Sequence, residues 1–179
     1  MYKRGFTIFF AVLVSSLALA IGLAIYDLLV RELELTQTAT QSQYAIYAAD
    51  TGAECALYWD SKYNGSDSAF ATSTDSAVLS SGVTCSGQDV AAVGTPPDPF
   101  SLPPSGWNPW DVDQTGTSAT TEFWVVLTGV SGNPCAWVTV QKTTTNPGDP
   151  PATVITSRGR NTCESGAPLQ IERTLQATY

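Results

Sequence analysis

The chain opens with MYKRGFTIFFAVLVSSLALAIGLAIYDLLV, which occupies residues 1–30. The segment Phe6–Tyr26 carries no group that is charged at neutral pH. As an α-helix it is long enough to cross the roughly 30 Å hydrocarbon core of a bilayer. Lys3 and Arg4 precede it, so the positive-inside rule places the N-terminus in the cytoplasm and the rest of the chain outside. The sequence therefore predicts a transmembrane helix over residues 6–30.

A cleaved secretory signal is the alternative interpretation of the same segment. Ala18-Leu19-Ala20 is an A-x-A cleavage site that follows a basic region and an apolar stretch. Cleavage there would leave residues 21–30 as an exposed apolar terminus with no obvious partner. A retained helix therefore fits the sequence better.

The composition narrows the chemistry that this chain can perform. Only 13% of its 179 residues are charged, with 16 acidic and 8 basic side chains, and histidine is absent. Without histidine the chain cannot form a Ser-His-Asp or Cys-His nucleophile pair or a histidine-ligated zinc site. The net charge of −8 and the lack of a basic cluster argue against direct nucleic-acid binding. We therefore expect a protein that is not an enzyme.

Two segments resemble a known family. The first is KRGFTI at residues 3–8, a basic leader that ends in glycine and is followed by Phe-Thr and an apolar helix. It is similar to the class III signal of type IV pilins and pseudopilins. The second is YAIYAADTGAECAL at residues 44–57, which resembles the A-A-[DE]-x-G-x-E-x-A-L segment of PilX-type minor pilins. The resemblance implies a pilin-like α+β fold, in which a long N-terminal helix packs against an antiparallel four-stranded sheet.

The resemblance also implies a processing step and a set of partners. Residues 1–5 would be a leader that prepilin peptidase removes by cutting between Gly5 and Phe6, with methylation of the new N-terminus. The precursor would lie in the bacterial inner membrane, and the assembly machinery there would transfer it to an extracellular filament of other pilin subunits. Phe10 occupies the fifth mature position, where most of the family has glutamate. This departure indicates a minor, tip or initiating subunit.

The leading prediction is therefore a structural subunit of a type IV pilus-like filament. A pseudopilin of a type II secretion system and a membrane-anchored surface binding protein are the alternatives. The sequence leaves open whether such a filament serves adhesion, motility or DNA uptake.

Five residues of the apolar helix are candidate filament contacts: Phe6, Phe10, Gly22, Asp27 and Arg31. Gly22 is a weak point, because glycine in a helix interior costs about 1 kcal/mol relative to alanine. Asp27 and Arg31 are one turn apart, so each offsets the other's charge where the helix leaves the lipid.

An amphipathic helix is expected to continue over residues 31–60. Its small and aromatic side chains form two adjoining stripes, which suit close packing of a sheet. The stripes comprise Tyr44, Ala48, Cys55 and Tyr58, and Ile46, Ala49, Ala53 and Leu57. Residues 61–121 are rich in Ser, Thr, Gly and Pro and predict a loop. Trp107 and Trp110 are expected to anchor this loop by packing, with a carbohydrate or partner surface as the alternative.

Residues 122–179 predict the sheet. Its four strands are expected at 123–130, 135–142, 153–160 and 169–179, joined by short polar turns. In the last strand Arg173 interrupts an otherwise apolar face. We expect its guanidinium group to reach an acid such as Glu54 or Glu172, or the sheet edge.

The four cysteines predict two disulfides. They show no C-x-x-C spacing and lie in the part expected outside the cytoplasm, so disulfides are favoured over a metal site. A hairpin register that pairs residue 142 with 153 places Cys135 opposite residue 160, three residues before Cys163. The sequence therefore predicts Cys135–Cys163, which leaves Cys55 to pair with Cys85.

One segment matches a calcium-loop template. Asp111, Asp113, Thr115, Gly116 and Glu122 fall at template positions 1, 3, 5, 6 and 12. Carboxylates suit a hard cation, so calcium is a candidate ligand, and an ordinary turn that leads into the first strand is the alternative. No other cofactor is predicted.

Overall fold

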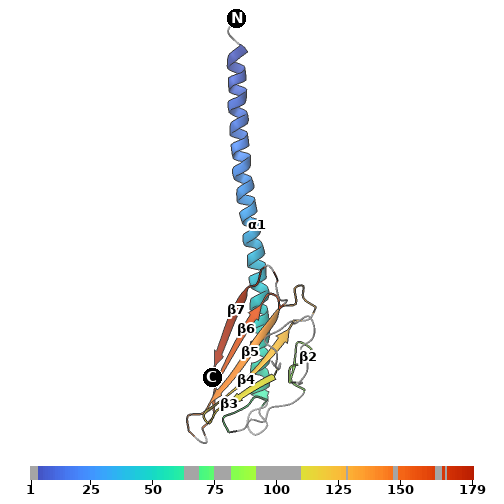
Figure 1. Cartoon of the computed structure of the whole chain (residues 1–179), viewed down its shortest axis with the longest axis vertical. Helices are drawn as coiled ribbons and strands as arrows, with labels where there is room; N and C mark the ends of the chain where they lie inside the picture. The colour runs from blue at the N-terminus through green and yellow to red at the C-terminus, as the bar shows by residue number, and fades with distance from the viewer. Residues whose placement is uncertain are drawn as a thin grey trace. The chain divides into compact units, whose positions relative to one another are not determined.

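The computed structural model describes residues 4–62, 69–74, 82–91, 110–127, 129–146, 149–163, 167 and 169–179. Its elements in chain order are α1 (Arg4–Lys62), β1 (Thr84–Cys85), β2 (Gln88–Asp89), β3 (Trp110–Gln114), β4 (Ser118–Val126), β5 (Cys135–Thr143), β6 (Ala152–Arg160) and β7 (Glu172–Thr178) (Figure 1). The chain divides into two units, Met1–Thr40 and Gln41–Tyr179.

The described part of the first unit, which begins at Arg4, is a single stretch of helix α1, a helix of 59 residues in all. The helix is continuous through Gly22, where an added Cβ would meet no atom within 4 Å. The hydroxyls of Ser15 and Ser16 donate to the carbonyls of Ala11 and Leu13, each at 2.8 Å. These hydroxyls therefore find acceptors within the helix itself and need no water.

The second unit contains a five-stranded antiparallel sheet of order β3-β4-β5-β6-β7, so the predicted sheet of four strands is wrong by one strand. The extra strand, β3, has the sequence WDVDQ and lies in the segment expected to be loop. Its two aspartates have low strand propensity, and its pairing with β4 stabilises it instead. The hairpin of β1 and β2 forms a separate two-stranded sheet.

The register of the β5–β6 hairpin is the one predicted from the sequence. Lys142 lies opposite Thr153, and Cys135 lies opposite Arg160. Side chains alternate along these strands, so Val138 and Val140 point into the core while Thr139 and Gln141 point to the opposite face.

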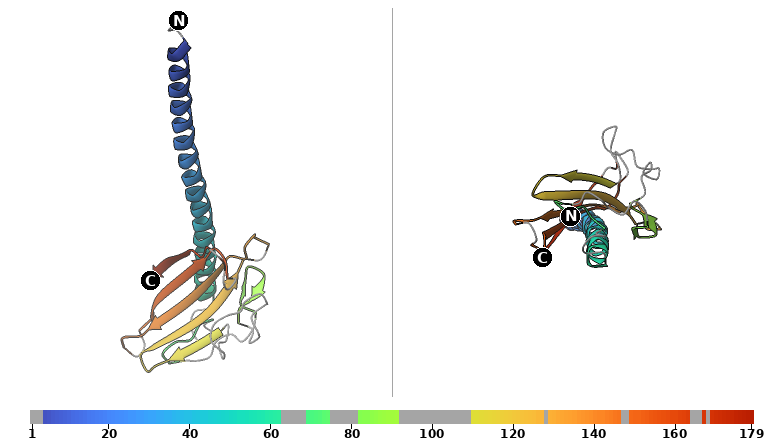
Figure 2. Two further views of the ribbon diagram at one scale, coloured as in Figure 1. Left: turned by 45° about the horizontal axis from the view of Figure 1, so that its top comes forward. Right: turned by 90° about the horizontal axis from the view of Figure 1, so that it is seen from below.

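Small residues let α1 approach the sheet closely, and the helix covers one face of it (Figure 2). Ala45, Ala48, Ala49 and Ala56 are completely buried. A Cβ added to Gly159 of β6 would overlap backbone atoms of Ala45 and Ala49. The helix backbone therefore rests almost directly on the backbone of β6.

The predicted stripes identify this face only in part. Ala48, Ala49 and Ala53 are buried as expected, whereas Ile46 is 43% exposed and Tyr58 is 55% exposed. The reason is that close approach selects the smallest side chains, while Ile46 and Tyr58 turn away from the sheet.

Candidate functional site

The first unit presents an apolar surface on every side. Each side chain from Phe6 to Leu29 is exposed. The large apolar ones are Phe6, Ile8, Phe9, Phe10, Val12, Leu13, Val14, Leu17, Leu19, Ile21, Leu23, Ile25, Tyr26, Leu28 and Leu29. By length and composition the helix is able to cross a membrane, and it is also compatible with a signal sequence. An apolar surface this large requires an apolar environment.

Four of the five predicted contact residues lie on this surface, and Arg31 follows it by two residues. Gly5 and Phe6 are in the first turns of α1, and the Phe6 side chain is 74% exposed. Phe10 is 58% exposed. Asp27 and Arg31 form the expected ion pair, with Arg31 Nη2 at 3.1 Å from Asp27 Oδ2. Each of the two charges is thereby partly neutralised at the end of the apolar segment.

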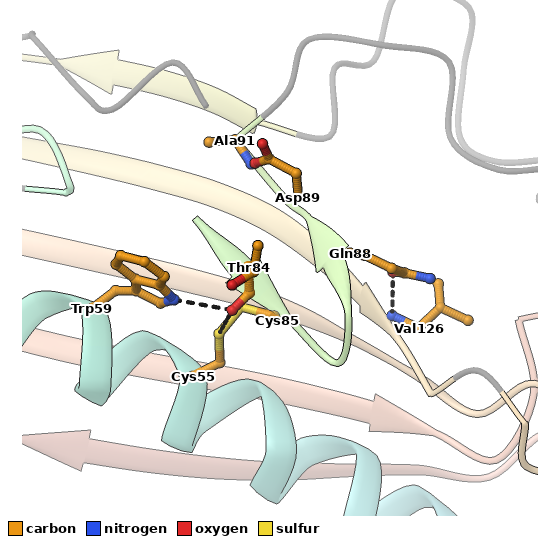
Figure 3. The surroundings of a disulfide bond; sticks show 8 residues. All are labelled: Cys55, Trp59, Thr84, Cys85, Gln88, Asp89, Ala91 and Val126. Atoms are coloured by element: carbon orange, nitrogen blue, oxygen red, sulfur yellow. Dashed lines mark hydrogen bonds between the residues drawn. A yellow bond between two sulfur atoms is a disulfide. The ribbon is translucent and has the colours of Figure 1, made fainter. Parts of the chain in front are cut away.

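In the second unit, a disulfide fastens the β1–β2 hairpin to α1 (Figure 3). Cys55 and Cys85 are joined as predicted, with their Cα atoms 5.8 Å apart. Beside them, Trp59 Nε1 donates to the carbonyl of Thr84 at 3.2 Å. On the other side of the hairpin, the side-chain carbonyl of Gln88 accepts from the backbone N–H of Val126 at 3.3 Å. The hairpin therefore links the helix to β4.

The turn of this hairpin is formed by Ser86 and Gly87, two residues for which the sequence predicted no role. Ser86 has φ 50° and Gly87 has φ 77°. Two central residues with positive φ form the tight turn that matches the twist of paired strands. This turn places Cys85 and Gln88 opposite each other in the register.

The second predicted disulfide, Cys135–Cys163, is also present, with a Cα–Cα distance of 6.0 Å. It lies in a small apolar cluster with Trp124 and Val126, separate from the main core. The ring of Trp137 stacks on that of Trp124 at a centroid distance of 5.4 Å. This cluster covers part of the sheet face that points away from α1.

A polar triad, of which Asp60 and Lys142 are buried, joins three distant parts of the second unit. Lys142 Nζ lies 2.5 Å from Asp60 Oδ1, and both side chains are about 95% buried. The hydroxyl of Tyr179 donates to Asp60 Oδ2 at 2.6 Å. Partial burial raises the pKa of Tyr179 well above its ordinary value, and the contact with Asp60 raises it further. The phenol therefore stays protonated and remains a donor.

Sequence reasoning missed this triad. The alternation of β5 contained a usable signal, because Lys142 follows Val138 and Val140 at two-residue steps on the inward face. A lysine on that face requires an acid. The sequence, however, contained no signal that identifies Asp60 as that acid.

In the described part of the chain, Arg173 reaches neither of the two acids predicted for it, Glu54 and Glu172, nor an acceptor on the sheet edge. Arg173 Nε donates to Ser42 Oγ on α1 at 2.9 Å. Glu172 instead pairs with Arg160, at 2.8 Å. Glu172 and Arg160 are directly opposite in the β6–β7 register, and this proximity decides the pairing.

The calcium template folds as the β3–β4 hairpin. Asp111 lies opposite Glu122 and Asp113 opposite Thr120, and the N–H of Thr115 donates to the carbonyl of Ser118 at 2.7 Å. Within the described residues, no group of three or more His, Cys, Asp or Glu side chains is placed to hold a metal ion. This geometry supports the turn that the sequence left as the alternative, and calcium stays a prediction.

Most of the predicted loop, including Trp107, lies outside the described residues, so its packing stays a prediction. Comparison with known protein families, with curated proteins and with solved structures found no match for this chain.

Proposed function

We propose that this chain is a structural subunit of a type IV pilus-like filament, in a minor, tip or initiating position. Prepilin peptidase cuts between Gly5 and Phe6, and the bacterial inner membrane holds the precursor until assembly. The observation that carries the proposal is the apolar surface of α1 from Phe6 to Leu29, which is exposed around the whole helix.

This surface suits two environments in succession. Burial of apolar surface contributes about 25 cal/mol per Å², so a helix that is apolar on every side is unstable in water. Lipid tails cover it in the precursor, and the helices of neighbouring subunits cover it in the filament. Because both environments are apolar, the transfer between them needs little hydrophobic free energy.

The second unit supports an extracytoplasmic location. Its four cysteines form two disulfides, each closing a loop of about 30 residues. Disulfides persist in oxidising compartments and contribute about 3 kcal/mol each for loops of this size. The disulfides therefore add to the stability that the apolar core of this unit provides.

Phe10 supports a specialised position in the filament. In the family that this chain resembles, a glutamate at the fifth mature position neutralises the N-terminal amine of a neighbour. The exposed phenyl ring of Phe10 carries no charge, so it cannot neutralise the positive amine of a neighbour. A subunit that makes this contact on one side only, or not at all, fits a tip or an initiating complex.

The mature N-terminus tests the proposal. Cells that express the full chain are sheared, and intact-mass and N-terminal peptide analysis is applied to the filament and membrane fractions. Methylated Phe6 in the filament fraction is the expected result. A chain that begins at Ile21 identifies a secreted protein, and one that begins at Met1 identifies a plain membrane anchor; either result overturns the proposal.

A further inference from the structure

Arg173 is a cation whose described partner is neutral. It lies on the edge strand β7, its side chain is exposed, and Nε donates to the Ser42 hydroxyl at 2.9 Å. Arg160 and Lys142 of the same unit each have a carboxylate partner, and the Arg158 guanidinium lies over the Trp137 ring. The remaining N–H groups of the exposed Arg173 guanidinium are available to an acid outside the chain.

The helix offers such acids on the side that faces away from the sheet. Tyr47, Asp50, Glu54 and Tyr58 follow one another at three- and four-residue steps, and all four are exposed. Within the described residues, neither Asp50 nor Glu54 has an ion-pair partner. We call these four residues the acidic stripe. It is opposite the alanine-rich face that α1 packs on the sheet.

We propose that Arg173 of one subunit pairs with the acidic stripe of a neighbouring copy of the same chain, and that this contact sets the axial offset between the two copies. The inference rests on the proposed function. In a filament drawn from one membrane all copies have the same orientation, because the positive-inside rule orients each of them alike. The two helices are therefore parallel.

The offset follows from the position of Arg173 along α1. Its hydrogen bond to Ser42 fixes the guanidinium at the level of that residue. Asp50 and Glu54 lie about 12 Å and about 18 Å further along the helix, at a rise of 1.5 Å per residue. A neighbour displaced by about 12–18 Å thus brings its Arg173 beside the stripe.

The two surfaces differ, because one copy uses its helix and the next copy uses its sheet edge, which is a heterologous contact. The contact requires two adjacent copies of the chain, so it applies to a minor or initiating position and not to a single copy at the tip.

Reciprocal charge exchange in the full chain tests the inference. We expect Arg173→Glu and Glu54→Arg each to lower the amount of chain in the sheared filament fraction at least five-fold relative to the membrane fraction. The double variant that exchanges the two charges should recover at least half of the wild-type amount. Arg158→Glu is the matched control, since Arg158 is an exposed arginine of β6 on the other sheet face, and we expect little change.

A photo-cross-linking amino acid at Tyr58 gives a second readout that leaves every charge in place. Mass spectrometry should find it attached to residues of β7 in a second copy. Attachment to another face, or to other proteins alone, overturns the inference, as does a double variant that fails to recover while its disulfides are intact. If the wild-type chain is itself missing from the filament fraction, the proposed function fails instead.

Discussion

At the scale of single residues, the close packing of α1 on β6 depends on Gly159. We expect Gly159→Ala to lower the free energy of unfolding by about 3 kcal/mol, the upper end of the usual cost of overpacking, because the new methyl group meets helix backbone that cannot rotate away. Urea unfolding of the detergent-solubilised full chain measures the change.

Gly116→Ala is the control for this substitution, since a Cβ at that position would meet no atom within 4 Å. We expect its unfolding midpoint to stay near that of the wild type. Equal midpoints for the two alanine variants would show that the backbones of α1 and β6 are not in contact at Gly159.

Tyr179 gives a second prediction at this scale, on pH dependence. The phenol's pKa is raised in the folded state, so its contribution to stability is complete below the ordinary value of about 10 and is lost as the pH rises above it. Tyr179→Phe should lower stability at pH 7 by about 1 kcal/mol, the usual net value of one hydrogen bond. It should also flatten the decline above pH 10.

Unfolding midpoints measured from pH 7 to pH 11 test this prediction. Tyr47→Phe is the control, because the Tyr47 hydroxyl lies on the exposed side of α1 and makes no hydrogen bond with the described residues. A Tyr179→Phe variant whose stability still declines as steeply as the wild type above pH 10 would contradict the assignment.

At the scale of elements, the β1–β2 hairpin holds α1 to β4 through one disulfide and two hydrogen bonds. We expect the double variant Cys55→Ser/Cys85→Ser to lose about 3 kcal/mol of stability, since the unfolded chain regains the freedom that the bridge removes. Urea unfolding under non-reducing conditions measures this loss.

Trp59→Phe measures the contribution of the Trp59 hydrogen bond separately from that of the Cys55–Cys85 disulfide. A smaller aromatic ring remains, while the N–H that donates to Thr84 and part of the buried indole are lost, so we expect a cost of about 1 kcal/mol for the hydrogen bond and a further cost for the cavity. A double serine variant as stable as the wild type would mean that the disulfide adds nothing to the link between α1 and the hairpin.

At the scale of the whole molecule, processing at Gly5 should decide where the chain is found. In the proposed function, Gly5→Val blocks peptidase cleavage, so the precursor keeps its two basic residues and stays in the membrane fraction. Intact-mass measurement should find chains that begin at Met1. Gly22→Ala is the control and should be processed normally, because its Cβ would occupy open space; equal processing of both variants would refute the cleavage site.

Local patterns along the chain were sufficient to predict the helix, four of the strands and both disulfides. The apolar run and the helical spacing act within a few residues, and the β5–β6 register follows from a hairpin with a short turn, so Cys135 and Cys163 could be paired in advance. The exposed surface from Phe6 to Leu29 was predicted in the same way, because its composition alone requires an apolar environment.

Only the tertiary structure could decide β3, the triad of Asp60, Lys142 and Tyr179, and the true neighbours of Arg173. β3 is a strand because β4 lies beside it, although its own residues favour a turn. The triad joins residues as far as 119 positions apart, and no local pattern carries information across that distance. Hydrophobic periodicity records which face of an element is buried, whereas the partner of a charged side chain depends on which distant elements the folded chain brings together.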